Sequence, residues 1–210
     1  MANLISKLGF AAAVISTATL ASAQDVNWSW GIDFTSNYVF AGVTQSDDKP
    51  AIQPWFEVES RGFYFSFWGS TVDLGPDDWE LDYYLGYRST TGYDLNWDVS
   101  VARYTYDSTG YCCSEVRLDL SYPIADRGVI GGFLGVDPDT GDVHRYLDGS
   151  YNISNKITAL GRYGASDSLG TEYWQLGASY VLSDRVSADL RYHGANVGDA
   201  GLVFNLSLGF

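Results

Sequence analysis

The sequence predicts an all-β fold, an antiparallel transmembrane β-barrel of about twelve strands that follows an N-terminal signal peptide. Three observations predict it. Apolar and polar residues alternate with a period of two along almost the whole chain after residue 24, as they do in strands with one apolar face. The chain holds 16 Tyr, 10 Phe, 7 Trp and 23 Gly, a composition that favours strands and turns over disorder. Beyond the N-terminus no segment has the length and apolarity of a membrane helix, so only a closed barrel could span a membrane.

The N-terminus has the pattern of a secretory signal. Lys7 supplies a positive charge, residues 8–20 are an apolar run, and Ala21, Ser22 and Ala23 are small residues suited to cleavage. The run is shorter than the roughly 18 apolar residues of a spanning helix. We therefore expect residues 1–23 to be a signal peptide and residues 24–210 to form one barrel of 210 − 23 = 187 residues. The expected location is the bacterial outer membrane, reached through the periplasm.

The alternation divides the chain into twelve expected strands of about nine to eleven residues, the length of a tilted membrane strand. In the first of them Trp28, Trp30 and Phe34 share the apolar face. Two details stay open: Pro54 should start the second strand or mark a bulge, and the faces of residues 129–136 cannot be separated. Tight connections are expected at residues 60–62, 89–92, 123–128, 152–155 and 183–184. Longer ones are expected at residues 42–50, 73–78, 106–114, 137–142, 165–171 and 194–200.

A soluble antiparallel barrel or sandwich would show the same period. The membrane form is favoured because the longer connections follow every odd strand, which matches short periplasmic turns and longer outer loops. The polar faces mix Tyr, Ser, Gly and Gln with charges, and aromatic residues such as Trp79, Tyr87 and Tyr122 cluster near strand ends like an interfacial girdle. The outward faces carry almost no charge between their ends.

The formal net charge of −14 makes the chain a poor partner for nucleic acid. If the polar faces line a lumen, that lumen is acidic and should attract cations. The alternative is that arginines and carboxylates simply pair and fill a narrow interior, because twelve strands lie between filled and channel-forming barrels. The residues expected to line a channel are Glu57, Glu59, Glu80, Asp82, Arg88, Asp94, Asp98, Glu115, Arg117, Asp119, Asp189 and Arg191.

An outer-membrane hydrolase is a second functional class, and a narrow structural barrel without transport is a third. A hydrolase needs a base beside a nucleophile or an activated water. The two histidines are His144 and His193. His193 and Asp189 share one strand face about 13 Å apart, too far for a hydrogen bond; a pair across the lumen with His144 stays open. We expect no enzyme activity, catalytic residue, metal or cofactor.

The two cysteines, Cys112 and Cys113, are adjacent. Neighbouring Cα atoms lie about 3.8 Å apart, whereas an unstrained disulfide needs about 4.4 Å or more. An ordinary structural disulfide is therefore not expected. A strained vicinal disulfide, two thiols and an intermolecular bond remain open, and the simplest expectation is two loop residues without chemistry.

Residues 36–53, SNYVFAGVTQSDDKPAIQ, carry a family resemblance. This segment resembles the opening motif of the TorF-type porin family, formerly described as conserved hypothetical proteins of Gram-negative bacteria. Residues 62–64, 68–70 and 80–87 also resemble it, whereas later residues share mainly the barrel pattern. The sequence departs at Ala41, where the family has Arg, and at Pro54 and Trp55, where it has glycines. The resemblance implies an outer-membrane, porin-like protein and brings no ligand or catalytic residue.

The last strand should close the barrel. Phe204, Leu206, Leu208 and Phe210 form its apolar face, and it must pair with the first strand to leave no open edge. A terminal aromatic residue also resembles the signal that hands barrel proteins to their assembly machinery. The expected partners are outer-membrane lipid, that machinery through residues 203–210, and small solutes. The expected function is passive diffusion of small, preferably cationic, solutes through a porin-like channel.

Overall fold

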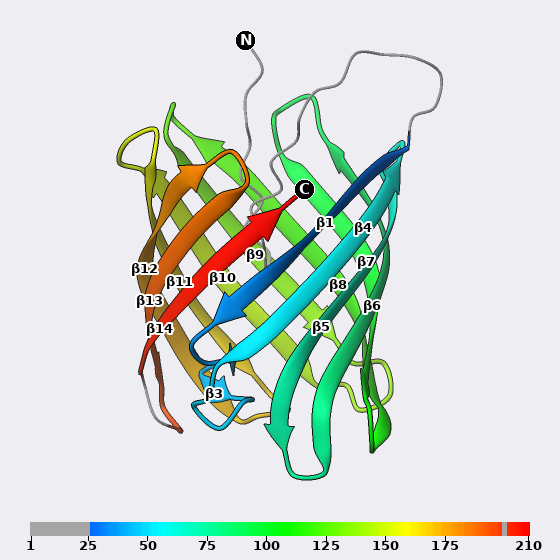
Figure 1. The fold of residues 1–210 in the computed structure, drawn as a ribbon. Helices are drawn as coiled ribbons and strands as arrows, with labels where there is room; N and C mark the ends of the chain where they lie inside the picture. Colours follow the sequence, from blue (N-terminus) through cyan, green and yellow to red (C-terminus); the bar gives the residue numbers. More distant parts are fainter. Residues whose placement is uncertain (1–25, 199–200) are drawn as a thin grey trace.

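A computed structural model describes residues 26–198 and 201–210, and within them the chain forms one closed antiparallel barrel (Figure 1). Each of the twelve wall strands pairs with its neighbours in sequence, and the first pairs with the last, so the predicted fold is confirmed. The predicted signal peptide, residues 1–23, lies outside the described residues. The strands are β1 (Asn27–Thr35), β2 (Val39–Phe40), β3 (Val43–Thr44), β4 (Ala51–Ser60), β5 (Phe63–Leu74), β6 (Asp77–Thr90), β7 (Asn96–Tyr106), β8 (Gly110–Ile124), β9 (Gly128–Val136), β10 (Val143–Asn152), β11 (Ile157–Ser166), β12 (Thr171–Ser183), β13 (Val186–Ala195) and β14 (Gly201–Gly209).

The seam between β1 and β14 closes the wall. Gly31 lies opposite Gly209 and Thr35 lies opposite Asn205 in one continuous antiparallel register. Backbone groups at the edge of β1 are thereby paired, as hydrocarbon surroundings would require. The predicted pairing of the first and last strands is confirmed.

The outer surface of the wall is apolar. Leu85, Leu147 and Leu176 are 66%, 72% and 60% exposed, which a water-soluble barrel would avoid on so many strands. The outward charges lie near strand ends: Arg145, for example, pairs with Asp167 at 3.1 Å where β10 begins. The alternation therefore predicted correctly which side chains face outward.

The glycine-rich strand β9 now has defined faces. Ile130 and Leu134 are exposed on the outside, whereas Phe133 is 6% exposed and belongs to the interior. Periodicity could not show this because glycine leaves no side chain to mark either face.

Several predicted strand and loop lengths are wrong. β6 has 14 residues and β8 has 15, so the strands outgrow the expected nine to eleven. The loops predicted at 73–78 and 106–114 shrink accordingly. Gly75 and Gly110 adopt positive φ angles of 69° and 81°, which allow tight reversals there. Conversely, the tight turn predicted at 89–92 lies at residues 91–95, because β6 continues to Thr90.

Pro54 lies inside β4 and neither starts the strand nor forms a bulge against β1. It stands opposite Ile32 in an unbroken register. On the other side of β4 the ladder with β5 begins only at the pair Trp55–Trp68. The missing N–H of proline is tolerated at this position because it coincides with the end of a ladder.

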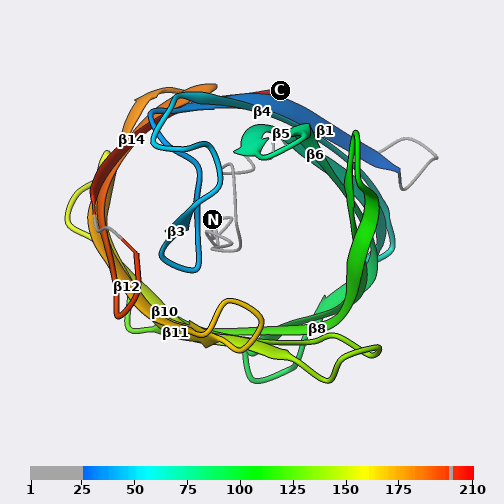
Figure 2. The same ribbon diagram turned by 90° about the horizontal axis from the view of Figure 1, so that it is seen from below.

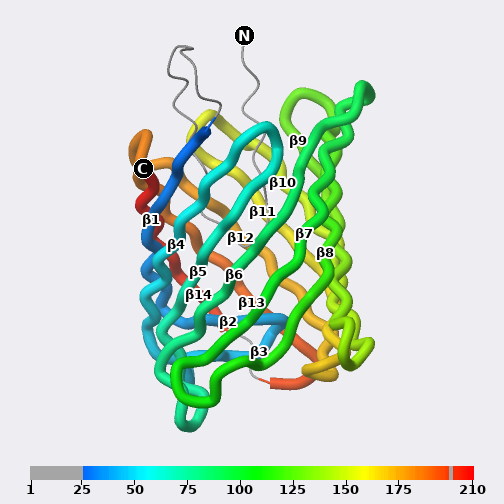
Figure 3. Tube along the Cα trace, turned by 90° about the vertical axis from the view of Figure 1, so that its right-hand side faces the viewer, coloured from blue at the N-terminus to red at the C-terminus, as the bar shows by residue number. Residues whose placement is uncertain are grey.

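The first connection, predicted as an outer loop at residues 42–50, begins earlier, at residue 36, and folds inward instead of facing solvent (Figure 2). Residues 36–50 fold back into the barrel, where β2 and β3 form a short hairpin (Figure 2). It lies at the end of the barrel away from the C-terminus (Figure 3). Ala41 and Gly42 link the two strands with φ angles of 46° and 84°, both positive as in the type I′ turns that suit two-residue hairpins.

The cysteines lie in strand β8 and not in a loop. Cys112 and Cys113 are joined in a disulfide. Tyr104 pairs with Cys113 and Thr105 pairs with Tyr111, so Cys112 is the extra residue of a β-bulge. Of the alternatives that the sequence left open for the two cysteines, the structure contains the vicinal disulfide.

Candidate functional site in the barrel interior

The barrel encloses a cavity of about 1040 Å³. Gly62 and Thr90 line it at the end with the β4–β5 and β6–β7 turns, and Thr140 and Leu169 line it at the end with the β9–β10 and β11–β12 loops. The described wall therefore borders one continuous space that reaches both ends of the barrel. Within the described residues, 26–198 and 201–210, no helix has the length and apolarity that a membrane span needs.

Carboxylates dominate the lining. Among the described residues, eleven Asp or Glu and three Arg border the cavity. An interior with this excess of negative charge can concentrate cations and repel anions. The predicted channel-lining residues that border it are Glu57, Glu59, Glu80, Asp82, Arg88, Asp98, Glu115, Arg117 and Asp119.

Three of the expected lining residues lie elsewhere. Asp189 and Arg191 form an ion pair of 2.7 Å on β13, outside the described lining of the large cavity. Asp94 lies in the turn between β6 and β7, exposed to solvent and with a positive φ of 62°. The assignment of Asp94 to the inner face of a strand is wrong, because β7 begins only at Asn96 and breaks the alternation assumed there.

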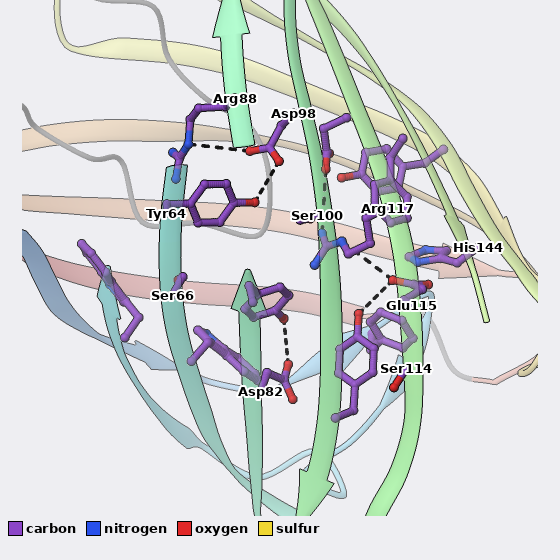
Figure 4. A pocket seen from close by; sticks show the side chains of 18 of the residues that line it. Tyr64, Ser66, Asp82, Arg88, Asp98, Ser100, Ser114, Glu115, Arg117 and His144 are labelled. Atoms are coloured by element: carbon purple, nitrogen blue, oxygen red, sulfur yellow. Dashed lines mark hydrogen bonds and ion pairs between the residues drawn. The ribbon is translucent and has the colours of Figure 1, made fainter. Parts of the chain in front are cut away.

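Arg88 organises one group of carboxylates on β4 and β7, of which Figure 4 shows Asp98. Its guanidinium lies 2.6 Å from Glu57, 3.5 Å from Glu59 and 3.7 Å from Asp98. The same guanidinium lies over the ring of Tyr64, 3.9 Å from its centroid, and the Tyr64 hydroxyl donates to Asp98 at 2.8 Å. A planar, permanently charged group suits this combination of ion pairing and stacking.

Arg117 organises a second group on β8, also visible in Figure 4. It lies 3.8 Å from Glu115 and 4.0 Å from Asp119, between the rings of Tyr84 and Phe133. Two arginines thus neutralise part of the acidic wall while the cavity beside them remains. The alternative of a fully paired, filled interior does not describe this arrangement.

Inward-facing glycines make room for these groups. A Cβ on Gly86 would lie 2.6 Å from the ring of Tyr64, and one on Gly135 would lie 2.4 Å from the carboxylate of Glu115. A Cβ on Gly31 would likewise lie 2.6 Å from the ring of Trp55. Sequence reasoning missed Trp55 as an inward residue. The sequence did contain a signal. Trp55 is apolar at a position where the alternation calls for a polar residue, and Gly31 on the polar face of the partner strand β1 leaves room for its ring.

The hairpin crosses the interior from the β1–β4 wall to the opposite wall. Ala41 packs into a buried cluster with Phe133, Tyr146 and Tyr173, and the Phe40 ring lies 5.1 Å from that of His144. Gly42 approaches so closely that a Cβ there would lie 2.5 Å from the Cβ of Ala195. The hairpin therefore narrows the cavity.

Polar contacts hold the base of the hairpin. Ser46 accepts a hydrogen bond from the Tyr38 backbone at 3.0 Å and donates to the carbonyl of Lys49 at 2.7 Å. The Lys49 ammonium bonds to Asp73 and lies 3.2 Å from Asp47. The hydrogen bond with Asp73, supported by that with Asp47, raises the pKa of Lys49 above its ordinary value. These contacts tie residues 36–50 to β5, and sequence reasoning gave no hint of them.

His144 takes part in packing. Its Nε2 lies 2.9 Å from the Tyr173 hydroxyl, and its ring contacts Phe40 and Phe133. Ser166 stands opposite His144 in the ladder, but its hydroxyl pairs with Ser168 at 3.1 Å. These contacts do not make the nucleophile–base pair that a serine hydrolase uses. In the part of the chain that the structure describes, no three His, Cys, Asp or Glu residues are grouped to hold a metal ion.

Solved outer-membrane porins share this fold. The KdgM porin superposes with a TM-score of 0.67 over 87% of this chain and 98% of its own, at 7% identity. The NanC porin gives 0.57 over 88% and 99%, at 10% identity. The outer membrane protein Omp33 of Acinetobacter baumannii gives 0.52 over 89% and 99%, at 10% identity. At such identities the likeness shows the fold.

Sequence comparison adds one family. The model of a family described as a bacterial protein of unknown function (Gcw_chp) matches residues 18–204. No curated protein matches the chain.

Proposed function

The chain belongs to the Gcw_chp family of bacterial proteins of unknown function, and we propose that it is an outer-membrane channel for passive diffusion of small, preferably cationic, solutes. The resemblance of residues 36–53 to TorF-type porins agrees with this proposal. So do the names of the porins that share the fold.

The observation that carries the proposal is the cavity that reaches both ends of the barrel. Its lining runs from Gly62 and Thr90 at one end to Thr140 and Leu169 at the other. A barrel that only held its own wall together would fill this space with side chains, as small barrels do. The retained space, lined by polar groups, supports transport.

The cation preference rests on charge. In the described part of the chain, eleven carboxylates against three arginines leave an acidic lining, and the low-dielectric wall strengthens its field inside the lumen. The lining residues in this proposal are the nine named above, together with the hairpin residues Tyr38, Phe40 and Gln45.

The location is part of the proposal. The exposed apolar band supports a lipid environment. Residues 1–23 would direct export, and the strand ending at Phe210 would engage the assembly machinery. Cell fractionation tests this: the protein should be found in the outer membrane, and a soluble periplasmic protein would contradict it.

The channel itself is tested in a planar bilayer with residues 24–210 refolded in detergent. Under a KCl gradient we expect stepwise conductance. The sign of the reversal potential should indicate that K⁺ passes more readily than Cl⁻. The control is the same preparation left unfolded in denaturant. No conductance from folded protein would overturn the channel, and a reversal potential of the opposite sign would overturn the cation preference alone.

A further inference from the structure

Two carboxylates in the lumen differ from the others. Glu80 and Asp82 lie on the inner face of β6, and they are only 6% and 3% exposed. Among the described residues neither forms an ion pair with Arg or Lys, whereas Glu57 pairs with Arg88 and Glu115 with Arg117. A buried carboxylate without a cationic partner is costly unless something supplies the positive charge.

Each of the two carboxylates has one oxygen bound and one oxygen open. The Tyr106 hydroxyl donates to Glu80 Oε1 at 3.1 Å, and the Tyr84 hydroxyl donates to Asp82 Oδ2 at 2.9 Å. Among the described residues, no hydrogen bond of ordinary geometry reaches Glu80 Oε2 or Asp82 Oδ1 although both oxygens are buried, and the Tyr38 hydroxyl interacts with the Glu80 carboxylate. Both residues border the cavity, and because the two oxygens themselves are covered, a solute in the lumen would donate to them only after displacing the side chains that cover them.

Aromatic rings surround the pair. In the ladders Asp82 stands between Trp68 on β5 and Tyr104 on β7, and Glu80 stands beside Tyr106. The hairpin adds Tyr38, whose ring lies 5.4 Å from that of Trp68. All these rings line the cavity. Ring faces attract organic cations, most strongly where water is excluded.

We propose that Glu80 and Asp82, with the rings of Trp68, Tyr84, Tyr104 and Tyr106, form a binding site for organic cations that carry N–H donors, such as alkyl ammonium or guanidinium groups. This inference rests on the proposed function and names its substrate class. The open oxygens need donors, which a tetraalkylammonium ion lacks. The two residues are two apart on one strand, about 6.6 Å, which suits a short aliphatic diamine.

A divalent metal ion fits the site less well. Calcium takes six to eight oxygen ligands and magnesium requires near-octahedral geometry. Two carboxylates among aromatic rings offer fewer ligands, and the described residues contain no larger acidic group around them. The aromatic surroundings are the feature that selects an organic cation.

The test uses 1,4-diaminobutane as a blocker of the KCl current through residues 24–210. The diamine should interrupt the current in a concentration-dependent manner, and tetramethylammonium at equal concentration should do so at least about tenfold more weakly. Asp82→Asn and Glu80→Gln should each raise the blocking concentration about tenfold or more, as the loss of a charge-assisted hydrogen bond predicts. Trp68→Leu tests the ring separately and should also weaken the block.

Asp142→Asn is the matched control. It removes one carboxylate from the same cavity lining, but directly before β10, four strands away from β6 in the wall. It should change the blocking concentration by less than about twofold if the site is local. An equal loss of block in Asp142→Asn and Asp82→Asn would mean that general lumen charge acts, and it would overturn the site.

A solution measurement separates this inference from the channel. Titration calorimetry of the detergent-refolded protein should detect 1,4-diaminobutane binding that Asp82→Asn weakens. If the wild type conducts but the diamine neither binds nor blocks, the site is refuted and the channel stands. If the protein binds diamine through Asp82 but does not conduct, the channel is refuted and the site stands.

Discussion

Trp30 and Phe210 hold the two ends of the barrel wall together. Their backbones exchange hydrogen bonds of 2.8 and 3.2 Å, and their rings stack with centroids 4.4 Å apart. Phe210 follows β14 directly, so this pair extends the seam between β14 and β1.

Removing the seam should prevent assembly. Deletion of residues 203–210 leaves β1 and β13 with unpaired edges, which a bilayer does not tolerate. We expect no folded, heat-modifiable band in the outer membrane. Phe210→Ala keeps the backbone pairs and should cost about 0.5–1.5 kcal/mol in the free energy of unfolding, the worth of an aromatic pair. A folded truncated protein in the membrane would contradict the closure.

The hairpin should set the width of the lumen. Gly42→Val places a branched side chain at a φ of 84°, with its Cβ 2.5 Å from that of Ala195, so the hairpin should leave the far wall and single-channel conductance should rise. Gly141→Val is the control, since Gly141 has a φ of 81° and nothing within 4 Å of a Cβ. Equal conductance in the two variants would show that the hairpin does not limit the current.

Arg88 should oppose the cation preference. Arg88→Ala leaves Glu57, Glu59 and Asp98 without their guanidinium, so the reversal potential should shift further towards K⁺. The loss of charged hydrogen bonds should lower the free energy of unfolding by about 1.5–3 kcal/mol. Arg145→Ala removes an exposed pair with Asp167 and should cost about 0–1 kcal/mol with no shift in selectivity. An unchanged reversal potential in Arg88→Ala would count against the acidic lining.

Gly131 should be needed for an ion pair between β10 and β11. A Cβ there would lie 2.3 Å from Asp148 Oδ1, and Asp148 pairs with Arg162 at 3.0 Å. Gly131→Ala should therefore lower the free energy of unfolding by about 1–3 kcal/mol, measured as a lower midpoint of denaturant unfolding. Gly149→Ala is matched, because its Cβ would meet only the Val129 carbonyl at 3.5 Å. If both substitutions have the same effect, the close approach to Asp148 is not what matters.

The vicinal disulfide should block thiol labelling. Because Cys112 and Cys113 are bonded to each other, a maleimide reagent should not modify the refolded protein until a reductant is added, after which mass spectrometry should show two labels. Labelling without reduction would show that the thiols are not joined.

Sequence alone predicted the wall well, and for a clear reason. Where side chains alternate clearly, period two assigns each residue of a strand to one face, so Leu85 and Asp82 were placed on opposite sides of β6 as the structure has them. The same rule also failed at Asp94, where the strand had already ended. Periodicity carries no information about where a strand stops.

The interior was harder to predict. Tyr38 and Phe40 lie in a segment without a long alternating pattern, and their partners Trp68 and His144 are far away in sequence. Nothing local distinguishes a loop that folds inward from one that faces solvent. The grouping of Glu80 and Asp82 with Tyr104 and Tyr106 likewise depends on which residues of β6 and β7 stand opposite each other, which alternation alone does not give.

The hairpin at residues 36–50 separates two properties that strand number usually couples. Twelve strands fix the circumference and the lipid-facing surface, whereas one short insert sets how much of the enclosed space a solute meets. Exchanging that insert should therefore change which solutes pass while the strand pairing and the lipid-facing surface stay the same, which makes the barrel a starting point for engineered pores.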